Sequence, residues 1–349
     1  ILPMLDHIDK DAVQFYVYSN LEDAKKDDFT QRIKAHAAVW HDTLGQGDRS
    51  VMQAIKEDKI DILLELTGHA EGGNCLSIIA RRAAPVQVKW IGGLFNTSGL
   101  TEMDWIIGDA VEIPEGEEKW YTEQVYRMPD DYICYEPAEY AGDVQPLPAL
   151  DKGYVTFGNL NNPSKINQAS LDLWAEILTA VPDSKMLFSS PAFKEKPMHD
   201  KVVDAFAAHG VDTGRIIFEY GAPHKDFIKT YNRIDIALDP YPYSGGLTTC
   251  EALWLGVPVI ALPGPTFAGK HAATHLVHAG YENWVMNDKA QAVAWAKKWS
   301  EDLDGLANLR ADMRAKVAES SLVDGKRFAQ NFEKAMQHMW REYIKTDKE

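Results

Sequence analysis

The fold class of this chain is decided by the segment Leu238-Asp239-Pro240-Tyr241-Pro242-Tyr243-Ser244-Gly245-Gly246-Leu247-Thr248-Thr249-Cys250-Glu251-Ala252-Leu253-Trp254. It runs from an apolar strand through a glycine-rich turn into a helix. Units of this kind build α/β proteins with parallel sheets. The segment is neither a Walker A motif nor GxGxxG, because no lysine follows the glycines and their spacing differs.

The turn and the helix start have the chemistry of an anion site. Gly245 and Gly246 let backbone N–H groups approach a phosphate closely, and a helix N-terminus favours an anion. Thr248 or Thr249 can cap the helix. Glu251, one turn further, is placed to accept hydrogen bonds from a ribose diol. The same residues also fit an ordinary βα loop in which the glycines only make the turn.

Short apolar runs alternate with amphipathic helical stretches along the whole chain, which predicts βαβ units and parallel sheets. In the first half the predicted strands are Phe15 to Ser19, Ile60 to Leu66, Val86 to Ile91, Trp105 to Ile107 and Gln124 to Met128. In the second half they are Tyr154 to Phe157, Met186 to Ser189, Ile216 to Phe218, Ile234 to Leu238 and Val259 to Leu262. The segment from Ala169 to Ala180 is predicted to be helical.

A length of 349 residues predicts two domains of roughly 150 residues each. The segment from Tyr132 to Lys152 lacks periodicity and is rich in breakers, as expected of an interdomain linker. We therefore predict an amino-terminal lobe at residues 1–150 and a carboxyl-terminal lobe at residues 151–322.

The two ends of the chain both have helical patterns. Four large apolar residues recur every fourth position and predict a final helix within 323–349 that packs back across both lobes: Phe328, Phe332, Met336 and Trp340. Ile1 to Leu5 lack an initiator Met and already resemble part of an amphipathic helix. We therefore expect an incomplete amino-terminal lobe whose first element precedes residue 1.

The composition restricts the partners and the compartment. A formal net charge of −16 disfavours nucleic acid or an anionic membrane, because such surfaces are bound by clustered Lys and Arg. Cys75, Cys134 and Cys250 form no CxxC pair, which predicts free thiols rather than disulfides or a zinc site. There is no apolar run of roughly 18 residues and no signal pattern. We expect a cytoplasmic protein without a membrane span.

A second candidate segment is Gly158-Asn159-Leu160-Asn161-Asn162-Pro163-Ser164-Lys165, directly after a predicted strand. Ligands of doubly wound sheets bind at the carboxyl ends of strands, so Lys165 is expected to face the same crevice as Thr248. A lysine there can neutralise a leaving diphosphate. A solvated loop lysine is the alternative.

Three further candidates follow other predicted strands. In Ala222-Pro223-His224-Lys225-Asp226-Phe227, backbone groups can read a base edge and the Phe227 ring can stack on it, although Phe227 also fits an ordinary core position. His69 is a candidate general base or acceptor-site residue, or a satisfied loop histidine. His271, His275 and His278 share a helix face, but no carboxylate or cysteine pattern accompanies them, so we predict no metal site.

Together these segments resemble the catalytic region of the protein O-GlcNAc transferases, including their bacterial relatives, which are often attached to tetratricopeptide repeats. The resemblance covers nearly the whole chain. It is carried by Ile60 to Gly68, Ala84-Pro85-Val86-Gln87-Val88-Lys89-Trp90, Thr97-Ser98-Gly99, Asn162-Pro163-Ser164-Lys165, the loop at Ala222, Asp239-Pro240-Tyr241-Pro242-Tyr243, Gly256-Val257-Pro258-Val259 and Pro263-Gly264-Pro265-Thr266-Phe267-Ala268.

The resemblance implies a GT-B fold, in which the parallel sheets of two Rossmann-like lobes face a central cleft. It also implies an inverting, metal-independent transfer of GlcNAc from UDP-GlcNAc to Ser or Thr of proteins, without a cofactor. The amino-terminal lobe would be the acceptor side and the carboxyl-terminal lobe the donor side. For a bacterial member, flagellin or another surface protein is a candidate acceptor, and tetratricopeptide repeats are a candidate upstream partner.

Residue roles follow from the same resemblance. Lys165 looks like the catalytic lysine that contacts the diphosphate; His69, a candidate from its place after a strand, is the second catalytic candidate. The Ala222 backbone would bind the uracil edge, Phe227 would stack on the base, and Glu251 would take the ribose. The donor-binding set is Asn162, Ala222, His224, Phe227, Gly245, Gly246, Leu247, Thr248, Thr249 and Glu251.

The chain departs from the family pattern at several positions. His224 and Phe227 stand where animal members have Lys and His, and Glu251 stands where they have Asp. The turn after Trp90 is longer by one residue, and the family's functional His motif near the start of the first lobe is absent. Two alternatives therefore stay open. One is a transferase of the same fold with another donor, such as UDP-glucose, or another acceptor, such as Asn or a glycan. The other is a nucleotide-sugar-binding module without catalysis.

Overall fold

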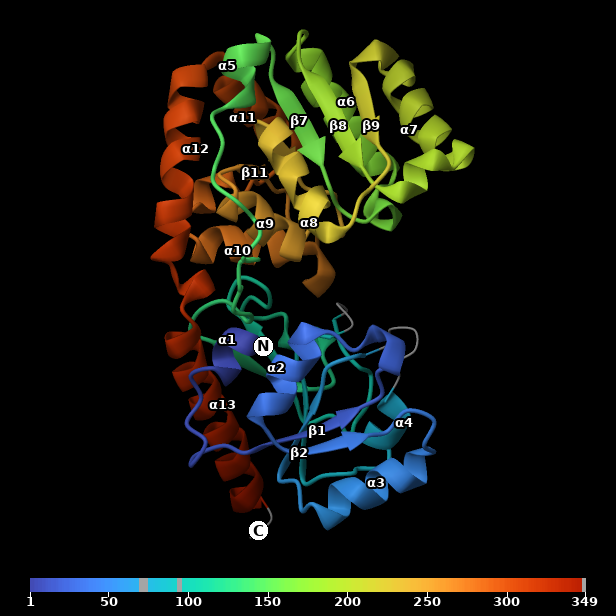
Figure 1. Ribbon diagram of the computed structural model, residues 1–349, viewed down its shortest axis with the longest axis vertical. Coiled ribbons are helices and arrows are strands. Elements are labelled where there is room, and N and C mark those ends of the chain that lie inside the picture. The colour runs from blue at the N-terminus through green and yellow to red at the C-terminus, as the bar shows by residue number, and fades with distance from the viewer. Residues whose placement is uncertain (69–74, 93–95, 347–349) are drawn as a thin grey trace. The chain divides into compact units, whose positions relative to one another are not determined.

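The computed structural model describes residues 1–68, 75–92 and 96–346, and its chain forms two compact units (Figure 1). The first unit comprises Ile1–Glu136 and Val323–Glu349, and the second comprises Pro137–Leu322. All named strands pair in parallel, so the predicted α/β class with parallel sheets is confirmed.

The first unit contains two parallel sheets rather than one. The larger has the order β3-β4-β5-β6, formed by Ile62–Glu65, Val86–Lys89, Trp105–Asp109 and Gln124–Met128. In the smaller, β1 (Phe15–Ser19) pairs with β2 (Ala37–Asp42). The sequence did not predict β2, since it follows α2 without a break and ends in His and Asp; pairing with β1 makes it extended. The helices are α1 (Leu2–Leu5), α2 (Asp28–His36), α3 (Asp48–Glu57), α4 (Leu76–Ile79) and α13 (Gly325–Thr346).

Helix α13 confirms the predicted final helix but not its predicted packing across both lobes. Its apolar face packs within the first unit, where Phe328 and Phe332 lie 6.1 and 4.9 Å from the ring of Trp90. Arg327 also donates two hydrogen bonds to Asp130, at 2.7 and 2.6 Å. The helix therefore belongs to the first unit, because its apolar face is covered there by the core around β4.

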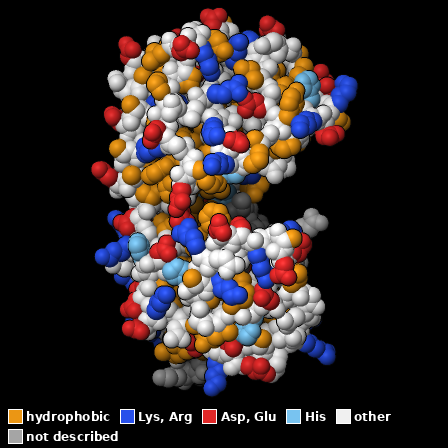
Figure 2. Space-filling model, in the orientation of Figure 1, with side chains coloured by type: hydrophobic (Ala, Val, Ile, Leu, Met, Phe, Trp, Pro, Cys, Tyr) orange, Lys and Arg blue, Asp and Glu red, His pale blue; other side chains and the backbone are white. Residues whose placement is uncertain are grey.

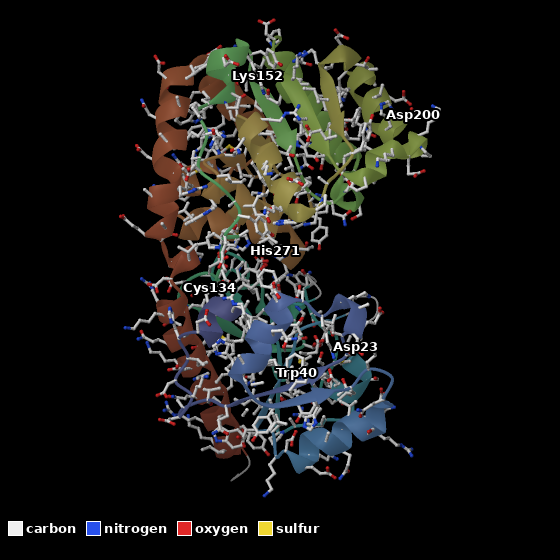
Figure 3. The ribbon with its side chains drawn as sticks, viewed as in Figure 1. Asp23, Trp40, Cys134, Lys152, Asp200 and His271 are labelled. Carbon is white, nitrogen blue, oxygen red and sulfur yellow. The ribbon has the colours of Figure 1, made fainter. Side chains whose placement is uncertain are left out.

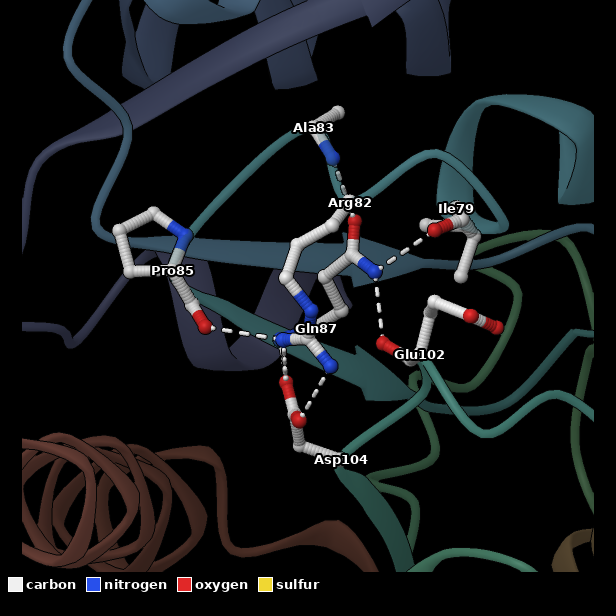
Figure 4. Close-up of polar contacts among 7 residues, drawn as sticks. All are labelled: Ile79, Arg82, Ala83, Pro85, Gln87, Glu102 and Asp104. Atoms are coloured by element: carbon white, nitrogen blue, oxygen red, sulfur yellow. Dashed lines mark hydrogen bonds and ion pairs between the residues drawn. The ribbon is translucent and has the colours of Figure 1, made fainter. Parts of the chain in front are cut away.

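A buried glutamine joins the end of α4, the loop that follows it and the loop before β5 (Figure 4). Gln87, on the fully buried strand β4, donates its Nε2 to the carbonyls of Ile79 and Glu102, at 2.9 and 2.7 Å, and accepts from the N–H of Ala83 at 3.0 Å. Next to it, Arg82 contacts both carboxylate oxygens of Asp104 at 2.9 Å. One side chain thus bonds three backbone groups, and two of them, the N–H of Ala83 and the carbonyl of Glu102, depend on it.

The second unit has one five-stranded parallel sheet with the order β11-β10-β7-β8-β9. Its strands are β7 (Thr156–Asn159), β8 (Lys185–Ser189), β9 (Ile216–Glu219), β10 (Ile236–Leu238) and β11 (Val259–Ile260). Its helices are α5 (Pro148–Lys152), α6 (Gln168–Ala180), α7 (Lys196–Ala208), α8 (His224–Phe227), α9 (Leu247–Trp254), α10 (His271–His278), α11 (Lys289–Glu301) and α12 (Leu303–Ala318). All five predicted strands and the predicted helix from Ala169 to Ala180 are confirmed, within a few residues at their ends.

The strand order places a topological switch between β7 and β10. The chain proceeds from β7 to β8 and β9 on one side, then returns to β10 and β11 on the other. Lys152 lies at the amino end of β7, and His271 lies at the opposite end of this unit, where the strands point (Figures 1 and 3). Ligands of open parallel sheets bind at the carboxyl ends beside such a switch.

The boundary between the units lies at Glu136/Pro137, so the predicted boundary at residue 150 is wrong. The reason is that the breaker-rich segment is hydrogen-bonded to the second unit. Arg310, which is buried on α12, donates to the carbonyl of Gln145 at 2.7 Å, and the N–H of Ala149 donates to Asp235 at 2.8 Å. An extended segment thus belongs to whichever core satisfies its backbone groups.

Replacing Gln87 by Leu should destabilise the first unit. The change leaves the carbonyl of Glu102 and the N–H of Ala83 without a partner among the described residues, at a cost of about 1–3 kcal/mol for each orphaned group. The carbonyl of Ile79 still accepts from the N–H of Arg82 at 2.9 Å. Urea denaturation followed by tryptophan fluorescence measures the loss. Gln53→Leu is the matched control, since Gln53 is exposed on α3 and bonds only Glu57 in the described structure, and it should stay within about 0.5 kcal/mol of wild type. Equal losses in the two variants would contradict the role of Gln87.

Candidate active site

Lys165 lies beside the turn that follows β10. It ends the short helix η3 (Pro163–Lys165), and its Nζ donates to the carbonyl of Ser244 at 2.7 Å. The same Nζ lies 4.2 Å from the ring centroid of Tyr243. Burial lowers the pKa of Lys165, and the charge of Asp239 opposes that shift. The structure thus contains a partly desolvated ammonium where the sequence predicted one, not a solvated loop lysine.

The turn after β10 leads into an uncapped helix. No side chain caps α9 at Gly246, so the first N–H groups of the helix have no side-chain partner among the described residues. The N–H of Gly245 points the other way and donates to Asp239 Oδ1 at 2.6 Å. Thr248 is half-buried whereas Thr249 is buried, so Thr248 presents the more accessible hydroxyl. This helix start can receive an anion.

Side-chain hydrogen bonds join the two loops at the switch point. The Thr248 hydroxyl donates to Asn161 Oδ1 at 2.9 Å, and Asn159 Nδ2 donates to the carbonyl of Leu238 at 2.8 Å. Asn162 is exposed and accepts from the N–H of Ser164, which fixes the start of η3. The loop that carries Lys165 and the turn that carries Thr248 are therefore joined by hydrogen bonds.

Glu251 is held in a hydrogen-bonded chain. His224 Nε2 lies 2.7 Å from Glu251 Oε1, and Tyr140 lies 2.8 Å from the other ring nitrogen of His224. The Tyr231 hydroxyl reaches Glu251 Oε2 at 3.4 Å and the carbonyl of Thr248 at 2.9 Å. Burial raises the pKa of Glu251, and the hydrogen bonds from His224 and Tyr231 oppose that shift. A ribose at this position would share Glu251 with these partners.

Phe227 lines a cavity of about 450 Å³ at the carboxyl end of the sheet. The cavity is also bordered by Leu160, Asn161, Asn162, Pro163, Ser189, Ser190, Pro191 and Ala192. The Phe227 ring is half-buried rather than enclosed in the core, and Ala222 is exposed in the loop before it. A flat aromatic surface beside an open cavity suits a planar ring of a ligand.

The remaining histidine candidates from the sequence are His69 and the group on α10. His69 lies outside the described residues. His271 and His275 are fully buried on α10, and within residues 1–68, 75–92 and 96–346 no three His, Cys, Asp or Glu side chains are grouped so as to hold a metal ion. Cys75, Cys134 and Cys250 are free thiols in the structure.

Surface charge and helix composition add two observations. On the face shown in Figure 2, Lys and Arg side chains are interspersed with Asp and Glu over both units. Among the helices that the structure describes, none combines the length and the apolar character needed to cross a bilayer.

Comparison with known proteins identifies the family. Residues 2–140 and 146–332 match the family model described as glycosyl transferase family 41. The chain belongs to glycosyl transferase family 41. This confirms the resemblance to O-GlcNAc transferases that the sequence motifs carried.

Among family 41 relatives, the chain is 36% identical over 346 residues to the probable UDP-N-acetylglucosamine–peptide N-acetylglucosaminyltransferase SPINDLY of Solanum lycopersicum, covering 98% of this chain and 37% of that protein. It is 27% identical to the corresponding SEC protein of Arabidopsis thaliana, covering 95% and 34% of the two chains. The chain thus spans little more than a third of the length of these curated relatives.

Solved structures give the fold. A mutant of the Thermobaculum terrenum O-GlcNAc transferase superposes with a TM-score of 0.92 at 33% identity, covering 99% of this chain and 65% of that chain. Anabaena HepE is similar in fold alone, with a TM-score of 0.52 at 15% identity, over 93% and 91% of the two chains. The family 41 chain therefore has the GT-B class of fold, as predicted.

Four residues at this site were not singled out from the sequence: Asn161, Tyr140, Tyr231 and Asp239. Asn161 and Asp239 stand inside the two motifs that the sequence analysis quoted, so their position was a signal. Tyr140 and Tyr231 carry no such signal, because only folding brings them to His224 and Glu251.

The two glycines of the turn should respond differently to a methyl group. At Gly245 a Cβ would lie 2.8 Å from Asp239 Oδ1 and 2.9 Å from the hydroxyls of Thr248 and Thr249, whereas at Gly246 it would meet nothing within 4 Å. Gly245→Ala should therefore lower the free energy of unfolding by about 1–3 kcal/mol, as overpacking does. Gly246→Ala should cost less, because the new methyl group meets no atom and only the poorer N-cap preference of Ala acts. Thermal unfolding of both variants checks this, and equal midpoints would count against the crowded turn.

Proposed function

We propose that this chain is the catalytic part of an inverting, metal-independent glycosyltransferase that transfers GlcNAc from UDP-GlcNAc to Ser or Thr of a protein. The observation that carries the proposal is the convergence of the Lys165 ammonium and the uncapped start of α9 at the β7/β10 switch point. Membership of family 41 and the activities for which its relatives are named support the same reaction.

The diphosphate of the donor would lie between Lys165 and the start of α9. Lys165 then exchanges the carbonyl of Ser244 for a phosphate oxygen, and the N–H groups near Gly246 and Leu247 donate to the second phosphate. Both interactions are stronger in a partly desolvated site than in water. As the sugar–phosphate bond breaks, negative charge grows on the leaving diphosphate, and these fixed donors stabilise it without a metal ion.

The nucleoside would extend from there toward α8. The Phe227 ring stacks on the base at the 450 Å³ cavity, and the Ala222 backbone reads the base edge. Glu251 accepts from the ribose hydroxyls while His224 holds its other side. Thr248 presents a hydroxyl to the phosphates. Thr249 is buried, and its hydroxyl lies against Gly245 in the turn.

The transfer step is a single displacement. The acceptor hydroxyl oxygen attacks the anomeric carbon, the bond from that carbon to the diphosphate oxygen breaks with its electron pair going to UDP, and the hydroxyl proton passes to a base. His69 is the base suggested by the sequence. Inversion at the anomeric carbon follows from one displacement.

The partners and the compartment belong to the same proposal. We propose a protein acceptor, with flagellin or another bacterial surface protein as the first to test, and tetratricopeptide repeats upstream in the full-length protein. The free cysteines fit a reducing cytoplasm.

Calorimetric titration tests the donor site. UDP and UDP-GlcNAc, without metal, should bind the wild-type chain, and Lys165→Ala should weaken binding roughly 10- to 150-fold, since a hydrogen bond to a charged group contributes about 1.5–3 kcal/mol. Lys297→Ala is the control, because Lys297 is exposed on α11 and pairs with Glu301 on the same helix. Binding of neither ligand to a folded sample would refute the donor assignment.

A second measurement separates the alternatives. Co-expression with a candidate acceptor and mass spectrometry should reveal an added N-acetylhexosamine that Lys165→Ala abolishes. A panel of UDP- and GDP-linked sugars identifies another donor if UDP-GlcNAc is inactive, and the modified residue distinguishes Ser or Thr from Asn. Tight nucleotide binding without transfer in the full-length protein would favour a binding module.

A further inference from the structure

Asp239 is a fully buried carboxyl group directly behind the candidate diphosphate site. It follows β10 immediately, and its Oδ1 accepts the N–H of Gly245 at 2.6 Å. A Cβ on Gly245 would lie only 2.8 Å from that oxygen, so the backbone of the turn lies against the carboxylate. Its other oxygen, Oδ2, is buried and has no hydrogen-bond partner in the part of the chain that the structure describes.

Asp239 and Lys165 form hydrogen bonds with the two ends of the same peptide group. The N–H of Gly245 donates to Asp239, and the carbonyl of the same peptide, that of Ser244, accepts from Lys165 Nζ at 2.7 Å. The peptide dipole therefore has its positive end at the carboxylate and its negative end at the ammonium. Both hydrogen bonds are charge-assisted, and each polarises the peptide in the direction that strengthens the other.

We propose that Asp239 is a positioning residue for Lys165, which it keeps charged and in place by acting through the Ser244–Gly245 peptide. This rests on the proposed function, in which Lys165 meets the donor diphosphate. Lys165 is partly buried, and desolvation favours its neutral form. The negative charge of Asp239 is the compensating interaction, and it favours the protonated ammonium without a direct ion pair.

Two further side chains, His275 and Tyr243, lie close to Asp239 and Lys165. Lys165 on η3 and His275 on α10 both lie near enough to Asp239 to influence its charge, and the ring of Tyr243 lies against Lys165. Burial raises the pKa of Asp239 to about 7, while its hydrogen bond from Gly245 and the charges of Lys165 and His275 oppose that shift. Above that pH the carboxylate is ionised and supports the ammonium.

The test is the pH dependence of UDP affinity, measured by calorimetry without metal. Affinity of the wild-type chain should fall at alkaline pH as Lys165 loses its proton. In Asp239→Asn, the amide oxygen can still accept from Gly245, but the negative charge is gone, so the pKa of Lys165 should drop and the alkaline fall should begin about one pH unit or more lower. A merely structural role would lower the thermal midpoint without moving this limb.

Three variants show whether the shift of the alkaline limb comes from Lys165 and Asp239. Lys165→Arg should abolish the alkaline fall, because a guanidinium stays protonated. His275→Gln should retain the wild-type limb, and so should Asp172→Asn, which makes the same charge change on the surface of α6. Asp239→Ser, whose hydroxyl can also accept from Gly245, is used in parallel in case the Asn variant does not fold.

The outcomes separate this inference from the proposed function. If the wild-type chain binds no UDP, the proposed donor site fails. If the wild-type chain binds UDP and the alkaline limb of the folded Asp239 variants coincides with that of wild type, the donor site stands and the role of Asp239 is refuted. A shifted limb that Asp172→Asn reproduces would likewise refute it.

Discussion

Strand β10 has a buried carboxylate immediately before it and another immediately after it, and the second unit is organised by these two charges. Asp235 accepts the N–H groups of Ala149 and Thr156, at 2.8 and 2.7 Å, and lies near the buried guanidinium of Arg310. Asp239 accepts the N–H of Gly245 at the other end. Burying a carboxylate is costly unless it is hydrogen-bonded or paired. The start of α5, the start of β7 and the turn before α9 are therefore fixed by the two carboxylates that flank this strand.

This arrangement explains how a chain with a net charge of −16 can offer a site for an anion. The cation is local and partly removed from water, and the helix start adds backbone donors that no side chain caps. Low local dielectric strengthens such interactions, whereas surface charges are screened. In the proposed reaction, one lysine and one helix N-terminus then serve where other enzymes use a metal ion.

The base and ribose end of the site is organised differently. Its polar side chains already bond one another. Tyr140 bonds His224, and both His224 and Tyr231 bond the carboxylate of Glu251. Preformed hydrogen bonds hold Glu251 in position before any ligand arrives, and the half-buried Phe227 leaves the adjacent cavity open. Donor selectivity would depend on how a ribose shares Glu251 with His224.

The sequence by itself determined the α/β class, nearly every strand, the final helix and the convergence of the loops at Lys165 and Thr248. These follow from local periodicity and from the rule that parallel strands present their carboxyl ends at one edge. Only the tertiary structure decided that β2 is a strand, that residues 137–150 belong to the second unit, and that α13 packs within the first. It also decided that Tyr140 and Tyr231 reach Glu251 and that Asp239 and Lys165 share one peptide group. Each of these depends on a partner far away in the chain, and buried polar groups choose their partners by proximity in space, which no local pattern records.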